Sequence, residues 1–132
     1  MATVLYTGLI GLLLVILSMR VIALRGNPAI VWFTFGYSGG NALVRAIRAH
    51  GNLTEYAPFF LLMMFIAEKD GYSSLALHYY GRTFLLGRLL HGICFGFMNE
   101  IFLLRVVGTV LTLSPILGLS TILIIRYFGI SW

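Results

Sequence analysis

Acidic side chains are scarce in this chain: four Asp and Glu stand against nine Lys and Arg among 132 residues. The cations form no tail or run, which argues against nucleic-acid binding. A single cysteine, Cys94, excludes an internal disulfide, and with three dispersed histidines it gives no metal-ligand spacing. The first residues lack the basic region and cleavage site of a signal peptide, so we expect a retained membrane helix there.

Apolar surface is in excess, since 60% of the residues are hydrophobic and 10% are charged. A soluble protein of this size cannot bury so much apolar surface, which makes lipid the expected solvent. One bilayer crossing takes about 20 mostly apolar residues. Four such segments are predicted, at residues 4–24, 41–68, 75–97 and 105–127. Short connections favour an up-down-up-down order, so residues 1–132 are predicted to form one all-α integral membrane four-helix bundle.

Two connections between these segments have distinctive compositions. Residues 26–40 combine Pro28 with the run Gly-Tyr-Ser-Gly-Gly, which is typical of a loop. The apolar stretch at 30–35 within this loop is expected on the membrane surface. Residues 68–70, Glu-Lys-Asp, are expected to form a solvated turn.

Glycines recur along the predicted first and third helices. Gly8 and Gly11 lie in the first, in one stripe with Ser18, and Gly81 and Gly87 lie in the third. Small residues at such positions let neighbouring membrane helices approach closely. They are equally well explained as the ordinary glycine content of membrane helices, and the sequence leaves both interpretations open.

Cations gather at one end of the predicted bundle. They are Arg20, Arg25, Arg45, Arg48 and Arg105. By the positive-inside rule this end, with the first and third loops, is expected in the cytoplasm and both termini outside. At the other end Arg82 is expected to be an interfacial anchor with a snorkelling side chain.

Polar residues in the second segment follow a helical spacing. Arg48, Asn52 and Glu55 stand at i, i+4 and i+7, which places them within roughly 60° of one another at about 100° per residue. The rest of the segment is apolar, so this stripe is expected to face protein. An intrahelical Arg48–Glu55 pair would be a purely structural explanation.

The balance of charge favours a binding site over such a pair. Only Glu55 and Glu100 lie near the five arginines that are predicted to gather at membrane depth, which are Arg25, Arg45, Arg48, Arg88 and Arg105. Arginine binds carboxylates through two parallel hydrogen bonds. A small organic anion is therefore the expected ligand.

The segment Arg-Ala-His-Gly-Asn-Leu-Thr-Glu-Tyr-Ala-Pro-Phe, residues 48–59, resembles the signature of the MAPEG family, the membrane-associated proteins of eicosanoid and glutathione metabolism. Residues 17–25 resemble the end of that family's first helix. Gly87-Arg88-Leu-Leu-His91 resembles its third-helix arginine motif, and Arg105-Val-Val-Gly-Thr the start of its fourth helix. The resemblance covers nearly the whole chain and is strongest to the short bacterial members.

This resemblance implies a homotrimer in the bacterial inner membrane, with glutathione as co-substrate between neighbouring subunits near the cytoplasmic face. Arg25 and His50 would reach in from the next subunit, and Arg88 would lie at the floor of the site. The glutathione-binding residues are then expected to be Arg25, Arg45, Arg48, His50, Asn52, Glu55, Tyr56, Arg88 and His91.

The activity that the resemblance implies is a glutathione transferase, or also a peroxidase, acting on hydrophobic electrophiles or lipid hydroperoxides that enter from the lipid. Arginines would hold the two carboxylates of glutathione and Glu55 its ammonium group. A nearby cation lowers the pKa of a thiol. Arg105 is the candidate for the group that stabilises the thiolate, which then attacks the electrophile.

Two departures from the family pattern support a different class of protein. His91 and Phe95 stand where family transferases commonly carry tyrosine. A membrane protein of the same fold that binds lipids or fatty-acid derivatives without chemistry is therefore the main alternative. A small drug exporter is disfavoured, because Glu55, its one candidate for cation coupling, lies among arginines.

Overall fold

The computed structural model describes residues 1–35, 40–98 and 102–129, and all of the regular structure in these ranges is helical. Its elements are α1 (Ala2–Leu24), η1 (Pro28–Thr34), α2 (Ala42–Lys69), α3 (Ser74–Gly96) and α4 (Phe102–Tyr127). Each α-helix begins and ends within three residues of its predicted range. The all-α prediction is confirmed, and the short 3₁₀-helix η1 was not foreseen.

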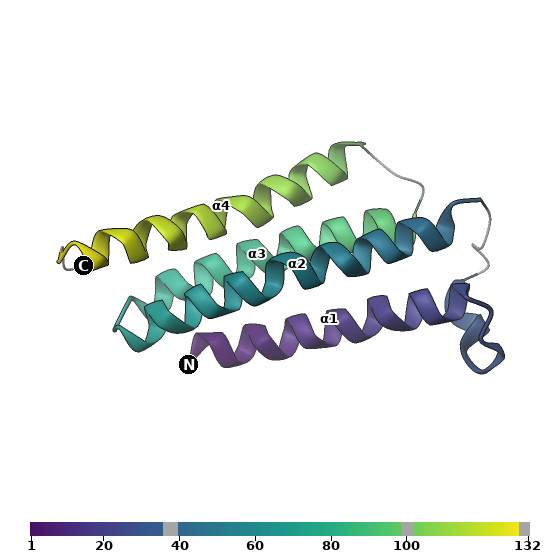
Figure 1. The fold of residues 1–132 in the computed structure, drawn as a ribbon, viewed down its shortest axis with the longest axis horizontal. Helices are drawn as coiled ribbons and strands as arrows, with labels where there is room; N and C mark the ends of the chain where they lie inside the picture. Colours follow the sequence, from purple (N-terminus) through teal and green to yellow (C-terminus); the bar gives the residue numbers. More distant parts are fainter. Residues whose placement is uncertain (36–39, 99–101, 130–132) are drawn as a thin grey trace.

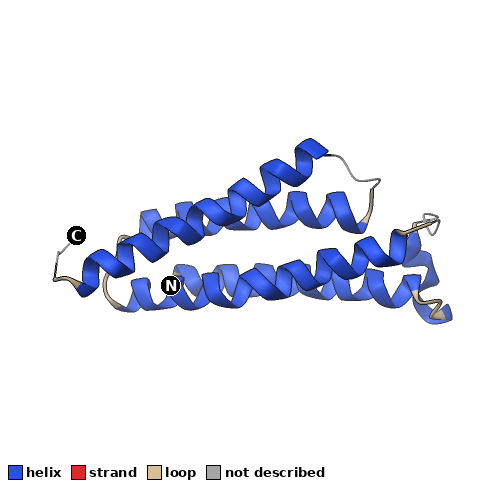
Figure 2. Ribbon diagram, turned by 45° about the horizontal axis from the view of Figure 1, so that its top comes forward, coloured by secondary structure: helices blue, strands red, loops and turns tan. Residues whose placement is uncertain are grey.

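Successive α-helices run in opposite directions, so both termini lie at one end of the bundle and η1 at the other (Figure 1). We call these the termini end and the η1 end. Helices α2 and α3 pack against each other and against both outer helices, whereas the described parts of α1 and α4 make no contact with each other. Figure 2 shows the long helices side by side, with the connections confined to the two ends.

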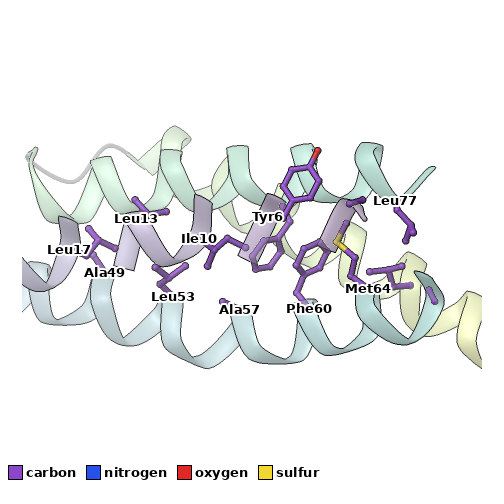
Figure 3. Close-up of a cluster of buried hydrophobic side chains, with 14 of the residues drawn as sticks. Tyr6, Ile10, Leu13, Leu17, Ala49, Leu53, Ala57, Phe60, Met64 and Leu77 are labelled. Carbon is purple, nitrogen blue, oxygen red and sulfur yellow. The ribbon is translucent and has the colours of Figure 1, made fainter. Parts of the chain in front are cut away.

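The core is a row of apolar side chains between α1, α2 and α3 (Figure 3). Tyr6, Ile10, Leu13 and Leu17 of α1 are buried, and their spacing of three and four residues places them on one helix face. In α2 the buried row is Ala49, Leu53, Ala57, Phe60 and Met64. The ring of Phe60 stacks on that of Phe84 in α3 with centroids 3.9 Å apart, which ties the two central helices together.

Two of the four glycines singled out in the sequence lie at close helix contacts. A Cβ atom on Gly87 would lie 2.9 Å from the carbonyl oxygen of Gly108 in α4, and one on Gly81 would overlap the Tyr6 ring. Close approach is therefore confirmed for the two glycines of α3. Within the chain it does not occur at Gly8 and Gly11, which have nothing within 4 Å of their Cβ positions.

The segment expected to be a loop on the membrane surface is instead the 3₁₀-helix η1. Asn27 starts it, because its side-chain oxygen accepts the amide hydrogen of Ala29 at 3.0 Å. Arg20, completely buried in α1, anchors it: Nη1 donates to the Phe33 carbonyl at 3.0 Å and Nε donates to Gly96 at 2.9 Å. The rest of the predicted loop, residues 36–39, lies outside the described residues.

The prediction of a solvated turn at residues 68–70 was wrong for Glu68. Its carboxylate accepts the amide hydrogens of Ala2 and of Thr3, the latter at 3.1 Å, and so caps the first turn of α1. Asp70 is half-exposed and accepts a 2.6 Å charged hydrogen bond from Nε of Arg126. The termini end is thus held by two carboxylates that both have partners.

Within the described ranges, two of the helices, α1 and α4, are by themselves long and apolar enough to cross a bilayer. The other two have sufficient length, with 28 residues in α2 and 23 in α3, but they carry the polar residues discussed next. Many large apolar side chains of all four helices face outward, including Leu12, Phe59, Leu75 and Leu117, each more than half exposed. Such a surface suits lipid as its solvent.

Candidate functional site

A cavity of about 500 Å³ opens at the η1 end between α2, α3 and α4. Pockets for small molecules usually measure about 300–1,000 Å³. The lining residues are Ile47, Arg48, Gly51, Asn52, Glu55, His91, Phe95 and Arg105. Five of the predicted site residues therefore meet in one cavity, because the first half of α2, the end of α3 and the start of α4 lie at the same end of the bundle.

The α2 wall of the cavity is the predicted stripe of Arg48, Asn52 and Glu55. Arg48 and Glu55 are exposed, and no ion pair joins these two described side chains. The purely structural explanation, an intrahelical Arg48–Glu55 pair, was therefore wrong. A cation and an anion at opposite ends of one stripe can bind a ligand that carries both charges.

Arg88 lies behind this wall. It is 3% exposed, and its Nη1 donates to the side-chain oxygen of Asn52 at 2.6 Å and to the Asn52 backbone oxygen at 3.2 Å. Its guanidinium group stands 5.5 Å from the centre of the Tyr56 ring. No acidic side chain among the described residues pairs with Arg88, so its positive charge remains as part of the field in the cavity.

The opposite wall comes from α3 and α4. The rings of His91 and Phe95 stack with centroids 4.6 Å apart, and the Arg105 guanidinium lies 5.2 Å from the centre of the Phe102 ring. Gly108, three residues after Arg105, packs against the backbone of Gly87 and His91. This close contact brings the start of α4 against the end of α3, so Arg105 faces the same cavity as His91.

Three of the predicted residues lie elsewhere. Arg25 and His50 line a separate cavity of about 230 Å³ on the other side of α2. His50 stands two residues after Arg48, which at about 100° per residue turns it roughly 160° away. Arg45 does not line the 500 Å³ cavity. Glu100 lies outside the described residues.

Sequence reasoning missed some contributors. Ile47 and Gly51 line the cavity beside the polar stripe, and the helical spacing that predicted Arg48 also places them next to it. Arg20 was counted only as a cation of one end, although it is buried and joins α1, η1 and α3. Its position in an apolar helix, far from any acid in sequence, was the available signal.

A helical bundle with outward-facing apolar surfaces and an arginine-lined cavity at one end defines an all-α membrane protein with a basic cavity. The family model described as the MAPEG family matches residues 3–125. The chain therefore belongs to the MAPEG family.

Two curated relatives carry the name Inner membrane protein YecN, from Escherichia coli strain K12 and from Escherichia coli O6:H1 strain CFT073. Each is 35% identical over 102 residues, covering 77% of this chain and 74% of the relative. No solved structure matches the chain. The family and these relatives agree with a membrane location.

Proposed function

We propose that this chain is a membrane-bound glutathione transferase that joins the sulfur of glutathione to hydrophobic electrophiles dissolved in the bilayer. The observation that carries the proposal is the charge of the cavity. Arg48 and Arg105 line it, Arg88 lies buried behind it, and Glu55 is the one acid among the described residues that line it. Glutathione, with two carboxylates and one ammonium group, has the complementary charges.

Binding would use each end of the α2 stripe. Arg48 would take a carboxylate through two parallel hydrogen bonds, and Glu55 would take the ammonium group. The side-chain oxygen of Asn52 already accepts a hydrogen bond from Arg88. The NH₂ group of Asn52 therefore remains to donate a hydrogen bond to the second carboxylate. Arg88 would act through Asn52 and through its charge, because it does not line the cavity itself.

The chemistry would begin with loss of the thiol proton to solvent. A free thiol ionises near pH 8.5, and a fixed cation such as Arg105 stabilises the thiolate. The thiolate then forms a carbon–sulfur bond with the electrophile while a leaving group departs with its electron pair, for example halide from an aryl halide. With a lipid hydroperoxide, two glutathione molecules would give the disulfide, an alcohol and water.

The proposal includes four membrane crossings, a homotrimer and a cytoplasmic η1 end. Its support within the fold is the placement of Arg25 and His50, which line a cavity between α1 and α2 and not the 500 Å³ cavity. Residues turned away from their own 500 Å³ cavity are available to a neighbouring subunit. Trimer formation would then add cations to a site that one chain builds in part.

The proposal is tested by adding glutathione to the purified protein in detergent and following two signals, heat of binding and ultraviolet absorbance of the thiolate. S-methylglutathione, which has no thiol, is the ligand control. We expect heat with both ligands and absorbance with glutathione alone. Arg48→Gln should weaken binding of both ligands about tenfold, an effect of about 1.4 kcal/mol, while Arg126→Gln at the termini end should change neither signal. Absence of heat and absorbance with the unaltered chain refutes the proposal.

A non-catalytic lipid-binding protein is the second candidate, and the apolar wall of the cavity favours it. Phe95 stacks on His91 on that wall, so part of the lining offers no hydrogen bond to a tripeptide. Such a protein would bind a fatty-acid derivative with the same affinity in the presence and absence of glutathione. It would give no thiolate absorbance.

A further inference from the structure

One face of α3 points away from the bundle along its whole length. The exposed residues of this face are Leu75, Tyr79, Arg82, Leu86, Leu89 and Ile93. At about 100° per residue they fall within roughly 40° of one line along the helix. Arg82 is the one charged residue on this otherwise apolar and aromatic face.

Arg82 lies in a second cavity, of about 320 Å³, between α3 and α4 in the half of the bundle near the termini end. Tyr79 and Thr83 line it on the side nearer the termini end, and Leu86 and Leu111 on the side nearer the middle of the bundle. None of the described residues that line it is acidic. Arg82 stands nine residues before His91, or about 13 Å along the helix axis, so this cavity is separate from the candidate site.

The charge of Arg82 has no counterpart in the described protein. Of the acids near it in the fold, Glu68 accepts the amide hydrogens at the start of α1, and Asp70 is paired with Arg126. No ion pair involves Arg82 among the described residues. A guanidinium group on an outward apolar face therefore has to find its partner outside the chain.

The depth of Arg82 identifies what surrounds it, provided that α3 crosses the membrane as the proposed function requires. The helix is about 34 Å long at about 1.5 Å per residue, close to the roughly 30 Å of a hydrocarbon core. Arg82 stands eight residues, or about 12 Å, past the first residue of α3. Its Cα atom is thus below the headgroups, but side chains tilt toward the helix N-terminus, which brings the guanidinium group up to the headgroup layer.

We propose that this cavity binds an anionic phospholipid. The Arg82 guanidinium and the Tyr79 hydroxyl would hold the phosphate, and an acyl chain would run along Leu86 and Leu111. The absence of an acid among the described lining residues favours an anionic headgroup over a zwitterionic one, because these residues offer no carboxylate to a choline or ethanolamine group. The inference depends on the crossing of α3 and not on glutathione chemistry.

Native mass spectrometry of the full chain in detergent tests this site. The protein is mixed with equal amounts of phosphatidylglycerol and phosphatidylcholine that carry the same acyl chains. We expect about fivefold more phosphatidylglycerol than phosphatidylcholine to remain bound. In Arg82→Gln the two lipids should be retained equally, and excess soluble glycerol phosphate should not displace phosphatidylglycerol from the unaltered chain.

Lys69→Gln is the matched control, because it removes one positive charge at the same end from a side chain that lies over Phe65, outside the cavity. The Lys69→Gln variant should keep the preference for phosphatidylglycerol over phosphatidylcholine. Tyr79→Phe, which removes only a hydroxyl group, should reduce the preference for phosphatidylglycerol in part. It is the second test of the site if Arg82→Gln does not fold.

The phospholipid site is refuted if the unaltered chain shows no preference between the two lipids, or if Arg82→Gln and Lys69→Gln lose the preference equally. It is also refuted if the oligomeric mass changes in Arg82→Gln, because the guanidinium group would then contact a second copy of the chain. Heat of glutathione binding measured on the same samples separates failure of this site from failure of the proposed function.

Discussion

Arg88 on α3 donates two hydrogen bonds from one nitrogen to Asn52 on α2, at 2.6 Å to the side-chain oxygen and 3.2 Å to the backbone oxygen. These bonds join the two central helices directly behind the 500 Å³ cavity. They also fix which end of the Asn52 amide faces Arg88, since a guanidinium group can only donate. A structural bond between helices therefore sets the group that α2 presents to a ligand.

Asn52→Asp separates the structural role of this contact from the binding role. The substitution keeps the shape of the side chain and gives Arg88 a charged acceptor, so thermal stability in detergent should be unchanged or higher. It also cancels one positive charge beside the cavity and removes the NH₂ donor. Glutathione affinity measured by calorimetry should fall at least about tenfold, or about 1.4 kcal/mol.

Asn41→Asp is the control, because it makes the same chemical change on the exposed residue that precedes α2. The affinity of the Asn41→Asp variant for glutathione should equal that of the unaltered chain. Equal affinity in Asn52→Asp would show that the ligand does not use this stripe.

Gly87→Ala should loosen the contact that places Arg105 opposite His91. A methyl group there would meet the Gly108 carbonyl oxygen at 2.9 Å, and backbone cannot yield as a flexible side chain does. Overpacking of this kind costs about 1–3 kcal/mol. We expect a lower melting temperature and weaker glutathione binding together, measured by differential scanning fluorimetry and calorimetry.

Gly8→Ala makes the same substitution on α1, where nothing lies within 4 Å of the added methyl. Its melting temperature should match or exceed that of the unaltered chain, since alanine favours helix more than glycine does. Similar losses in both variants would mean that helix contact at Gly87 has no special role.

The helices and the polar wall of α2 were predictable because both depend on local periodicity. Apolar runs of bilayer length fix the α-helices, and the spacing of Arg48, Asn52 and Glu55 fixes their shared face. The same periodicity turns His50 to the other side of α2, away from the stripe of Arg48, Asn52 and Glu55. Contacts between segments distant in sequence, such as Glu68 with the start of α1, leave no periodic signal, and they were missed for that reason.

Arg20→Met should release η1 from the bundle while leaving the long helices in place. The substitution keeps most of the buried volume but removes the donors to Phe33 and Gly96. The bond to Gly96 is buried and the bond to Phe33 partly buried, and a buried carbonyl oxygen left without a partner costs about 1–3 kcal/mol. Because η1 carries Trp32 and Phe33, chymotrypsin should cut the variant in this segment at least about tenfold faster, a ratio that corresponds to about 1.4 kcal/mol of local stability.

Arg25→Met is the comparison for that experiment, because it removes an exposed arginine of the same end. Its cleavage rate should equal that of the unaltered chain. Resistance of Arg20→Met to cleavage would show that apolar contacts alone hold η1.

Arg105→Ala tests whether this arginine stabilises the thiolate or only attracts glutathione. A cation beside the sulfur favours the charged form, so its removal should return the pKa of the bound thiol toward the free value near 8.5. The rate of conjugation to an aryl halide should then fall at pH 7 and recover as the pH rises past that value, because the thiolate fraction is restored without Arg105. Arg105→Lys keeps a charge and should retain part of the rate at pH 7, whereas Arg48→Gln should raise the KM for glutathione without moving the pH profile. The opposite result is a pH profile of Arg105→Ala that superimposes on that of the unaltered chain, with a higher KM for glutathione as the one change. It would mean that Arg105 only attracts the tripeptide and that another group on the cavity wall activates the sulfur.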